Sequence, residues 1–337
     1  MATDGPLLDV RGLSVSFPAP RGERLTVASG VTFDVGAGEV VGLVGESGSG
    51  KTVSSLAISG LVAAQGGRVE GSARLDGTEL VGLPEKELRQ LRGARVSMVF
   101  QQAIRSLNPG LTVGEQIAET VRRHRQVSRK AAWDRAVEML DRVGIANPSA
   151  RAQEYPHQFS GGMCQRVMIA MALCCDPRLL IADEPTTALD VTVQRRILDL
   201  LLELRAEQDI AILFITHDLG VIAEMCDRVV VMYAGEVVER GTMLDLFRRP
   251  RHPYTQGLLD AIPRGRGRRL VSIPGTVPPP MALPSGCRFA ARCPYAEPGR
   301  CDAEHPPLRQ VGDGSSGTRE ARCVRAEELE LSGVVTA

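Results

Sequence analysis

The fold of this chain is decided by one stretch, Gly45-Glu46-Ser47-Gly48-Ser49-Gly50-Lys51-Thr52, which fits the phosphate-binding pattern G-x-x-x-x-G-K-[ST]. The apolar run before it, 40–44, is of strand type, and 53–61 behind it has the pattern of a helix rich in Ala, Ser and Leu. Strand, Gly-rich turn and helix are the context that this P-loop motif requires. Its glycines let backbone N–H groups converge on a phosphate at the positive end of the helix. We therefore expect Lys51 to reach the β- and γ-phosphates of a nucleotide, and the Thr52 hydroxyl to bind Mg²⁺.

The composition is that of an ordinary globular protein. The chain has 337 residues, of which 43% are hydrophobic and 24% charged. Lys+Arg and Asp+Glu both number 40, so the net charge is zero and nothing indicates a nucleic-acid partner. The first ten residues lack the features of a signal peptide, and no stretch reaches about 18 apolar residues. These features predict a protein in the cytoplasm, without a membrane span of its own.

Strands are predicted on both sides of the P-loop. Alternating apolar and polar residues at 7–17 and 31–35 favour an antiparallel β-subdomain ahead of it, and further short strands are expected at 71–75 and 95–100. Phe17 lies where an aromatic ring could stack on a nucleotide base, and it could equally be a core residue of its strand. Residues 106–152 have a helical, charged pattern, in which Thr112 and Glu115 have the spacing of a capping box.

Polar side chains follow three further apolar strands. Gln101 could coordinate Mg²⁺ or the attacking water. Asp183 ends a buried strand and could hold Mg²⁺ through water, and Glu184 next to it is placed as a general base. His217 leaves the third strand, and a γ-phosphate contact is expected because ligands of open α/β sheets lie at the C-terminal strand ends.

Two helix starts carry groups that could bind an anion. Ser160, Gly161 and Gly162 open an apolar helix, with a hydroxyl, exposed N–H groups and the helix dipole at one point. This could also be a simple N-cap. Asp190 opens an amphipathic helix that runs to about Arg205, and it too could be only an N-cap.

Taken together, these elements resemble the nucleotide-binding domain of the ABC ATPases. The motifs, in order, are Walker A (45–52), Q-loop (Gln101), signature (159–163), Walker B (179–184), D-loop (188–190) and switch histidine (His217). The resemblance implies an α/β fold, with a RecA-like core, an antiparallel β-subdomain and a helical subdomain at about 102–176. It also implies ATP and Mg²⁺ as ligands, with Gln101 sensing Mg²⁺.

The resemblance further implies a dimer of two such domains that clamp two ATP molecules head to tail. Ser160-Gly161-Gly162 then contacts the ATP of the partner subunit. The usual signature is Leu-Ser-Gly-Gly-Gln followed by a basic residue, whereas this chain has Phe159, Met163 and Cys164 at the variable positions. The altered signature suggests a heterodimer with a paralogous ATP-binding subunit.

A narrower similarity lies in the flanks. Five segments look like the corresponding parts of the ATP-binding subunits of dipeptide/oligopeptide importers: 155–158, 167–173, 251–259, 284–289 and 292–294. This resemblance implies two membrane permease subunits and an extracytoplasmic substrate-binding protein as partners, and a place on the cytoplasmic face of the membrane. Nickel importers of the same subfamily share much of the pattern. A nickel importer or a non-transport ABC ATPase is therefore the alternative.

Four cysteines follow a Pro-rich spacer at 274–284, in the order Cys287-x₅-Cys293-x₇-Cys301-x₂₁-Cys323. Clustered cysteines in a reducing cytoplasm suggest metal more than disulfides. Four thiolates suit tetrahedral Zn²⁺ or a [4Fe–4S] cluster, although no C-x₂₋₄-C pair of the kind usual for structural zinc occurs. The importer resemblance implies the [4Fe–4S] cluster. Free thiols or a disulfide remain as alternatives.

These observations predict an ABC ATPase domain over residues 1–260 and a small Cys-rich C-terminal extension over 261–337. The predicted function is ATP hydrolysis that powers the import of di- or oligopeptides through separate membrane subunits.

Overall fold

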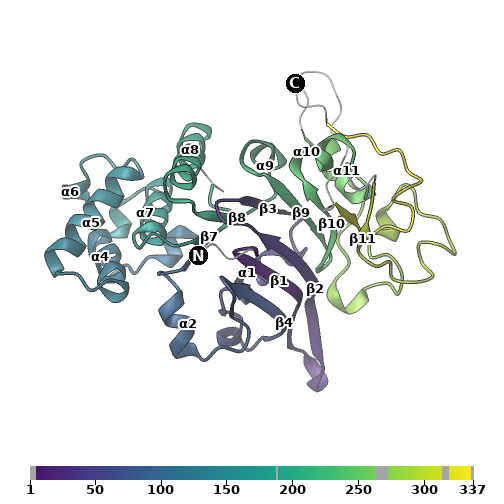
Figure 1. Ribbon diagram of the computed structural model, residues 1–337, viewed down its shortest axis with the longest axis horizontal. Coiled ribbons are helices and arrows are strands. Elements are labelled where there is room, and N and C mark those ends of the chain that lie inside the picture. The colour runs from purple at the N-terminus through teal and green to yellow at the C-terminus, as the bar shows by residue number, and fades with distance from the viewer. Residues whose placement is uncertain (1–4, 187–188, 263–271, 313–318, 335–337) are drawn as a thin grey trace. The chain divides into compact units, whose positions relative to one another are not determined.

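The computed structural model describes residues 5–186, 189–262, 272–312 and 319–334 (Figure 1). Contacts divide the chain into two compact units that alternate along the sequence. The first unit consists of Met1–Leu7, Val35–Glu39 and Leu83–Ile215, and the second of Leu8–Asp34, Val40–Gly82 and Thr216–Ala337. No described helix is long and apolar enough to cross a membrane.

The core of the first unit is a set of parallel strands. β6 (Val96–Val99) pairs with β7 (Leu179–Asp183), and β7 pairs with β8 (Ala211–Thr216). Every residue of β7 and β8 is buried, as expected for parallel strands that are covered on both faces and therefore have nearly continuous apolar sequences. The strands predicted in this part of the chain are confirmed.

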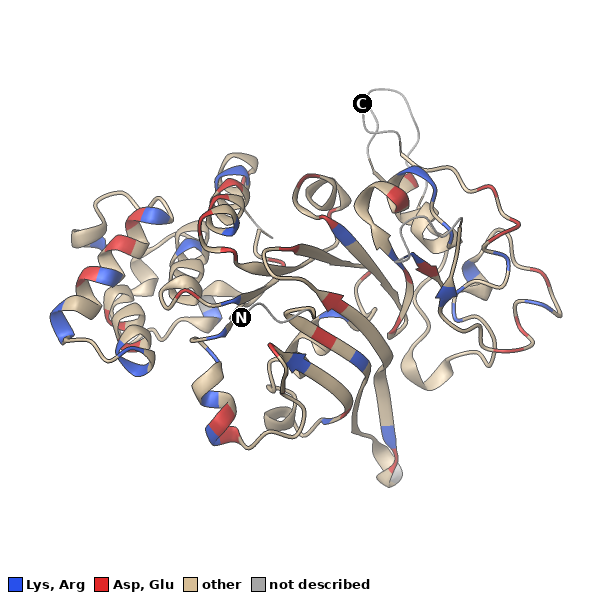
Figure 2. Ribbon diagram, in the orientation of Figure 1, with Lys and Arg blue, Asp and Glu red and all other residues tan. Residues whose placement is uncertain are grey.

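The first unit also contains several α-helices. They are α2 (Glu85–Leu91), α3 (Ala103–Ser106), α4 (Val113–His124), α5 (Arg129–Arg142), α6 (Pro148–Arg151), α7 (Gly161–Leu173) and α8 (Val191–Gln208). The helical pattern predicted from 106 to 152 is confirmed, and the Thr112 hydroxyl accepts a hydrogen bond from the Glu115 N–H, 3.3 Å away, at the start of α4. Both signs of charge are interspersed along α5 and α8 (Figure 2).

An antiparallel sheet in the second unit has the strand order β2-β1-β4-β5. Its members are β1 (Leu8–Pro18), β2 (Arg24–Val35), β4 (Arg68–Leu75) and β5 (Thr78–Glu79). The sequence predicted that this subdomain lies ahead of the P-loop in the chain. That prediction is incomplete, because β4 and β5 follow the P-loop and β4 pairs directly with β1. Local alternation identifies a strand, but it does not specify the distant strand with which it pairs.

The second unit also holds the strand that leads into the P-loop. β3 (Val40–Val44) runs parallel to β9 (Arg228–Tyr233), and β9 forms a hairpin with β10 (Glu236–Thr242). Ala234 and Gly235, between these two strands, have φ values of 46° and 85°, which suit a two-residue hairpin turn.

The C-terminal extension continues this sheet. β12 (Glu320–Ala321) pairs with β10, and β11 (Arg309–Gln310) pairs with β12. The helices of the second unit are α1 (Lys51–Ile58), α9 (Leu219–Met225), α10 (Met243–Arg248) and α11 (Pro253–Asp260). Because β12 is hydrogen-bonded to β10 and β11 to β12, the extension is built into this unit.

Candidate functional site

The P-loop connects the fully buried strand β3 to helix α1, as the motif predicts. Gly45 has a φ of 151°, and a Cβ atom on it would lie 2.2 Å from the backbone oxygen of Met232. Gly50, the residue before α1, has a φ of 96°. Both positions require glycine, because a side chain would be strained at either one and would collide with β9 at Gly45.

The side chain of Lys51 is folded over the loop. Its Nζ donates hydrogen bonds to the carbonyl oxygens of Gly45 and Glu46, at 2.7 and 2.9 Å, and to the Ser49 hydroxyl at 3.2 Å. Ser47, Gly48 and Thr52 are exposed. An anion at the N-terminus of α1 would therefore meet exposed loop residues, the ammonium group and the positive end of the helix dipole.

Glu46 is held in place by two residues that the sequence did not single out as site residues. Its N–H donates to the hydroxyl of Tyr254 on α11, at 2.7 Å. Its carboxylate accepts two hydrogen bonds from Arg292, Nη1 to Oε2 at 2.6 Å and Nη2 to Oε1 at 3.0 Å. The hydrogen bond to Glu46 raises the pKa of Arg292, and burial raises the pKa of Tyr254. Arg292 lies in the short 3₁₀ helix η5 (Ala290–Arg292) of the extension.

Phe17 is partly buried near the end of β1. Its ring lies against Gly67, where an added Cβ would be only 2.8 Å from Cε1. This contact positions the ring, and stacking on a base stays a prediction.

In the first unit, the structure brings Gln101 and Glu184 together. The Nε2 of Gln101 donates to Oε2 of Glu184 at 2.8 Å. Asp183, at the end of β7, is only 2% exposed. Glu184 has a φ of 48°, a left-handed conformation that is uncommon for residues other than glycine, and its N–H donates to the Ile215 oxygen at 2.8 Å. Such local strain is often found at functional sites.

The predicted signature lies at the start of α7. The Ser160 hydroxyl is the N-cap, accepting a hydrogen bond from the Met163 N–H at 3.4 Å. Cys164 is 1% exposed, its thiol lies 3.5 Å from the Pro156 oxygen, and burial raises its pKa. The position where a basic residue is usual is therefore inside the protein here. Gly162 lies beside Leu189, whose Cδ2 would be 3.3 Å from an added Cβ.

The two remaining predicted residues follow β7 and β8 along the chain. Asp190 caps α8, because its Oδ1 accepts from the Val193 N–H at 2.9 Å. Of the predicted D-loop, 188–190, Ala188 lies outside the described residues. His217 directly follows β8 and is exposed.

The four tail cysteines line one small cavity of about 20 Å³. Its other lining residues are mostly apolar, among them Pro253, Phe289, Ala290, Val324 and Leu329. Burial raises the pKa of Cys287, Cys293 and Cys323 to about 11. In the described part of the chain, no three His, Cys, Asp or Glu side chains lie close enough together to hold a single metal ion as they stand.

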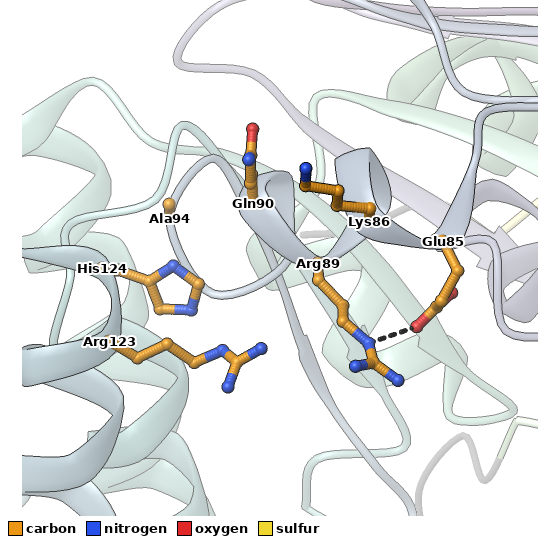
Figure 3. A pocket seen from close by; sticks show the side chains of 7 residues that line it. All are labelled: Glu85, Lys86, Arg89, Gln90, Ala94, Arg123 and His124. Carbon is orange, nitrogen blue, oxygen red and sulfur yellow. Dashed lines mark hydrogen bonds and ion pairs between the residues drawn. The ribbon is translucent and has the colours of Figure 1, made fainter.

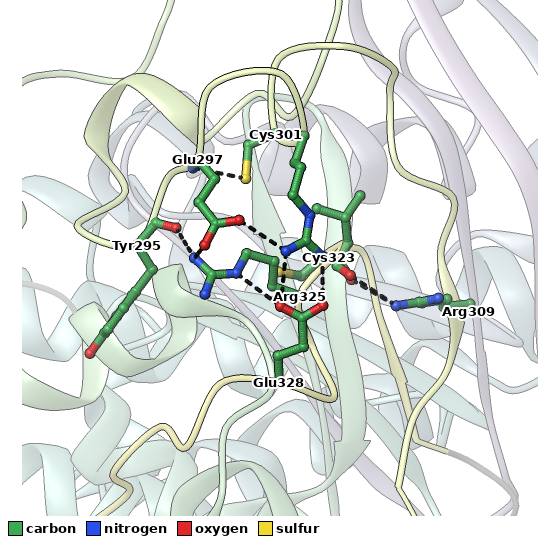
Figure 4. Close-up of polar contacts among 9 residues, drawn as sticks. Tyr295, Glu297, Cys301, Arg309, Cys323, Arg325 and Glu328 are labelled. Atoms are coloured by element: carbon green, nitrogen blue, oxygen red, sulfur yellow. Dashed lines mark hydrogen bonds and ion pairs between the residues drawn. The ribbon is translucent and has the colours of Figure 1, made fainter.

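Ion pairs lie near two of these cysteines, Cys301 and Cys323 (Figure 4). Arg325 contacts Glu297 at 2.8 Å and the Tyr295 oxygen at 2.7 Å, and Arg300 contacts Glu328 at 2.5 Å. Arg300 and Glu328 are each 47% exposed, so solvent screens their pair and it is expected to add little to stability.

Two buried glutamates of β10, Glu236 and Glu239, form ion pairs with residues of the extension. Glu236 is 2.9 Å from His305 and 3.4 Å from Arg288, and Glu239 is 3.1 Å from Arg319. Burial raises the pKa of both carboxyls. Truncating one of these arginines would leave a buried glutamate with fewer partners, so the contacts are expected to fix the position of the extension.

A second hollow, in the first unit, has a volume of about 690 Å³ and lies between α2 and the end of α4 (Figure 3). Its lining residues are Glu85, Lys86, Arg89, Gln90, Ala94, Arg123 and His124. Glu85 and Arg89, one turn apart on α2, pair with each other at 2.9 Å. These residues belong to none of the motifs described above.

Three features together define the class of the protein, which is an ABC-type ATPase. They are the P-loop, the pair Asp183-Glu184 at the end of β7 with Gln101 beside it, and the Ser-Gly-Gly start of α7. A family model described as ABC transporter matches residues 28–187, and one described as Oligopeptide/dipeptide transporter, C-terminal region matches 238–301.

Similar proteins agree with this class. The oligopeptide transport ATP-binding protein OppD of Escherichia coli is 50% identical over 91% of this chain and 91% of its own length. OppD of Haemophilus influenzae is 52% identical over 86% of this chain and 90% of its own length. The solved dimer of the ATP-binding cassette MJ0796 with ADP and phosphate has a TM-score of 0.64 and 28% identity, over 70% of this chain and 98% of that one. The chain therefore belongs to the ABC transporter family, in the oligopeptide/dipeptide group of its ATP-binding proteins.

Proposed function

We propose that the chain hydrolyses ATP to power the import of di- and oligopeptides, on the cytoplasmic face of a membrane and through separate permease subunits. The observation that carries this proposal is the match of both parts of the chain, the ATPase motifs and the C-terminal region, to one group of transporters. We also retain the division into an ATPase domain, 1–260, and an extension, 261–337. A substrate-binding protein that delivers the peptide belongs to the same proposal.

In the proposed site, the loop residues 45–50 and Lys51 hold the phosphates. Hydrogen bonds to two loop carbonyl oxygens and to the Ser49 hydroxyl hold Lys51 over the loop, where its ammonium group could turn to a bound phosphate. The Thr52 hydroxyl and the Asp183 carboxylate would hold Mg²⁺, with Gln101 sensing it, since these are the hard oxygen donors that this ion prefers. When bound, Mg²⁺ neutralises charge on the phosphate oxygens.

Glu184 is the proposed general base for the attacking water. A carboxylate accepts the proton, and the hydrogen bond from Gln101, 2.8 Å long, orients it. His217 is proposed to contact the γ-phosphate, and Phe17 the base. Because phosphoryl transfer has a loose transition state, positioning and charge neutralisation supply most of the catalysis.

The proposed second half of each site comes from another ATP-binding subunit. The start of α7 offers the Ser160 hydroxyl and the N–H groups of the first helical turn, at Gly161 and Gly162. Such groups suit the phosphates of a nucleotide that is held by the partner subunit. Asp190 lies in the adjoining D-loop. We propose that the partner is a paralogue, because Phe159, Met163 and Cys164 depart from the usual signature.

We further propose that Cys287, Cys293, Cys301 and Cys323 hold a [4Fe–4S] cluster. The four side chains line one largely apolar cavity, and the Cys287 N–H donates to the Cys301 oxygen at 2.8 Å, which ties two of them together. Tetrahedral Zn²⁺ would need four sulfurs about 2.3 Å from a single centre. In a cluster each cysteine binds a different iron, so the four sulfurs need not share one centre. When bound, it cross-links a segment with little core of its own.

Two experiments test these proposals. The chain is co-purified with its permease subunits in detergent or nanodiscs, and ATP hydrolysis is measured with and without substrate-binding protein loaded with a peptide. Peptide-dependent stimulation is expected, and stimulation by nickel instead would overturn the peptide assignment. Iron, sulfide, zinc and visible absorbance are assayed on anaerobically purified protein. A band near 400 nm with about four irons per chain is expected, whereas one zinc and no colour would replace the cluster by zinc.

A further inference from the structure

The extension reaches the P-loop directly through residues 287–293. Arg292 is 7% exposed and forms a two-point ion pair with Glu46, the second residue of the P-loop. Its other N–H groups are also used, donating to the Pro274 oxygen at 2.7 Å and the Tyr233 hydroxyl at 3.3 Å. The guanidinium is therefore fixed in one orientation by protein groups on several sides.

We infer that Arg292 is a positioning residue for nucleotide binding: it holds Glu46, and with it the P-loop, in the shape that receives the phosphates. The backbone of Glu46 shows why its position matters, because its carbonyl oxygen accepts from Lys51 at 2.9 Å and from the Ser49 N–H at 3.2 Å. A shift of Glu46 would move both the loop and the lysine. The inference rests on the proposed role of the P-loop in holding phosphates.

Charge gives Arg292 a second effect. Glu46 brings a carboxylate into a loop that is to receive the negative charges of a triphosphate, and like charges at short range disfavour binding. The paired guanidinium neutralises this carboxylate. Without Arg292, the carboxylate of Glu46 would lose its two-point ion pair, and solvent reaches only part of its side chain, which is 30% exposed.

A neighbouring contact supports the same arrangement. Arg288 donates to the Ala234 oxygen at 2.5 Å, and the adjacent Gly235 N–H donates to the Ser49 oxygen at 3.0 Å. Phe289 between the two arginines packs edge-on against Tyr233, with ring centroids 5.2 Å apart. Residues 287–293 thus brace the P-loop at two points, Glu46 directly and Ser49 through the β9–β10 turn.

The test is a titration of the full-length chain with ATP, read by calorimetry, together with KM and kcat in the complex with the permease. For Arg292→Ala we expect a Kd for ATP raised about tenfold, a higher KM and a nearly unchanged kcat, because Arg292 contacts no reacting atom. A merely structural defect would lower the amount of active protein without changing Kd. Arg300→Ala is the matched control, as it removes a two-partner arginine of the same extension away from the P-loop, and its Kd should equal that of the wild type.

The double variant Arg292→Ala/Glu46→Ala separates the charge effect. It should bind ATP more tightly than Arg292→Ala alone, because the unpaired carboxylate is gone. If Arg292→Ala does not fold, Arg292→Lys carries the test, since it keeps the charge but cannot form the two-point pair, and a raised Kd is again expected. A wild-type Kd in either single variant, or a double variant no better than Arg292→Ala, overturns the inference. Lys51→Ala shows whether a failure lies in this inference or in the proposed phosphate site. If Lys51→Ala also binds ATP with the wild-type Kd, the proposed phosphate site itself is wrong.

Discussion

Replacing Glu184 by glutamine tests the proposed chemistry of hydrolysis. The substitution keeps the size of the side chain and an oxygen that can still accept the 2.8 Å hydrogen bond from Gln101, and it leaves the left-handed backbone unchanged. What is lost is the ability to take a proton from water. General base catalysis contributes about 10²- to 10⁴-fold to rate, so turnover should fall by that factor, equivalent to about 3–5.5 kcal/mol of activation free energy.

The assay is phosphate release at saturating ATP by the complex with the permease subunits, with ATP affinity measured on the same samples. Glu184→Gln should bind ATP at least as tightly as the wild type, because one negative charge has been removed. Glu207→Gln is the matched control, since Glu207 lies on α8 with a side chain that is 60% exposed, and it pairs with Arg142. Turnover of Glu184→Gln within a few-fold of the wild type, with Glu207→Gln also normal, would refute the role of Glu184 as the base.

Three further predictions follow from particular contacts. Gly45→Ala should lower the free energy of unfolding by about 1–3 kcal/mol and impair ATP binding, because its Cβ would lie 2.2 Å from the Met232 oxygen. Gly77 is the control, since it has a φ of 78° but open space around it, and Gly77→Ala should lose less stability in urea unfolding. Equal losses in the two variants would contradict this reasoning. Burial opposes the pKa shift of Glu79, but hydrogen bonds from Ser72, Ala73 and Val81 outweigh it and lower the pKa below 4.5. The carboxylate therefore adds stability above pH 4.5 that is lost as the pH falls through the lowered pKa, so Glu79→Gln should be less stable than wild type at pH 7 and the gap should close in acid; a pH-independent gap in urea melts would contradict this. Cys293→Ser should lose the absorbance near 400 nm and melt at a lower temperature, and an unchanged spectrum and iron content would show that Cys293 is not a ligand.

Much of the proposed site could be predicted because its signals are local. Gly45, Lys51 and Thr52 are close in sequence, and the same segment supplies strand, loop and helix. The residue types of Ser160 and Asp190 are typical of helix starts, and both are N-caps in the structure. An apolar run followed by Asp183 and Glu184 is likewise readable from the sequence.

The contacts of Glu46 could not be predicted in this way. Tyr254 and Arg292 lie 208 and 246 residues away from it, and nothing in a local pattern specifies a pairing over such distances. Both lie in segments that the family resemblance had marked, although it gave them no role. The membership of β4 and β5 in the sheet of β1 was missed for the same reason, since register and partner depend on the whole fold.

The central claim is that this chain uses ATP to drive peptide import. The most direct measurement is the uptake of a labelled oligopeptide into vesicles that contain the chain with its permease subunits and binding protein, with ATP supplied on the side of the chain. The account predicts uptake that requires ATP and disappears with Lys51→Ala and with Glu184→Gln. Uptake that persists in both variants, or a complex that hydrolyses ATP and moves nickel but no peptide, would contradict it.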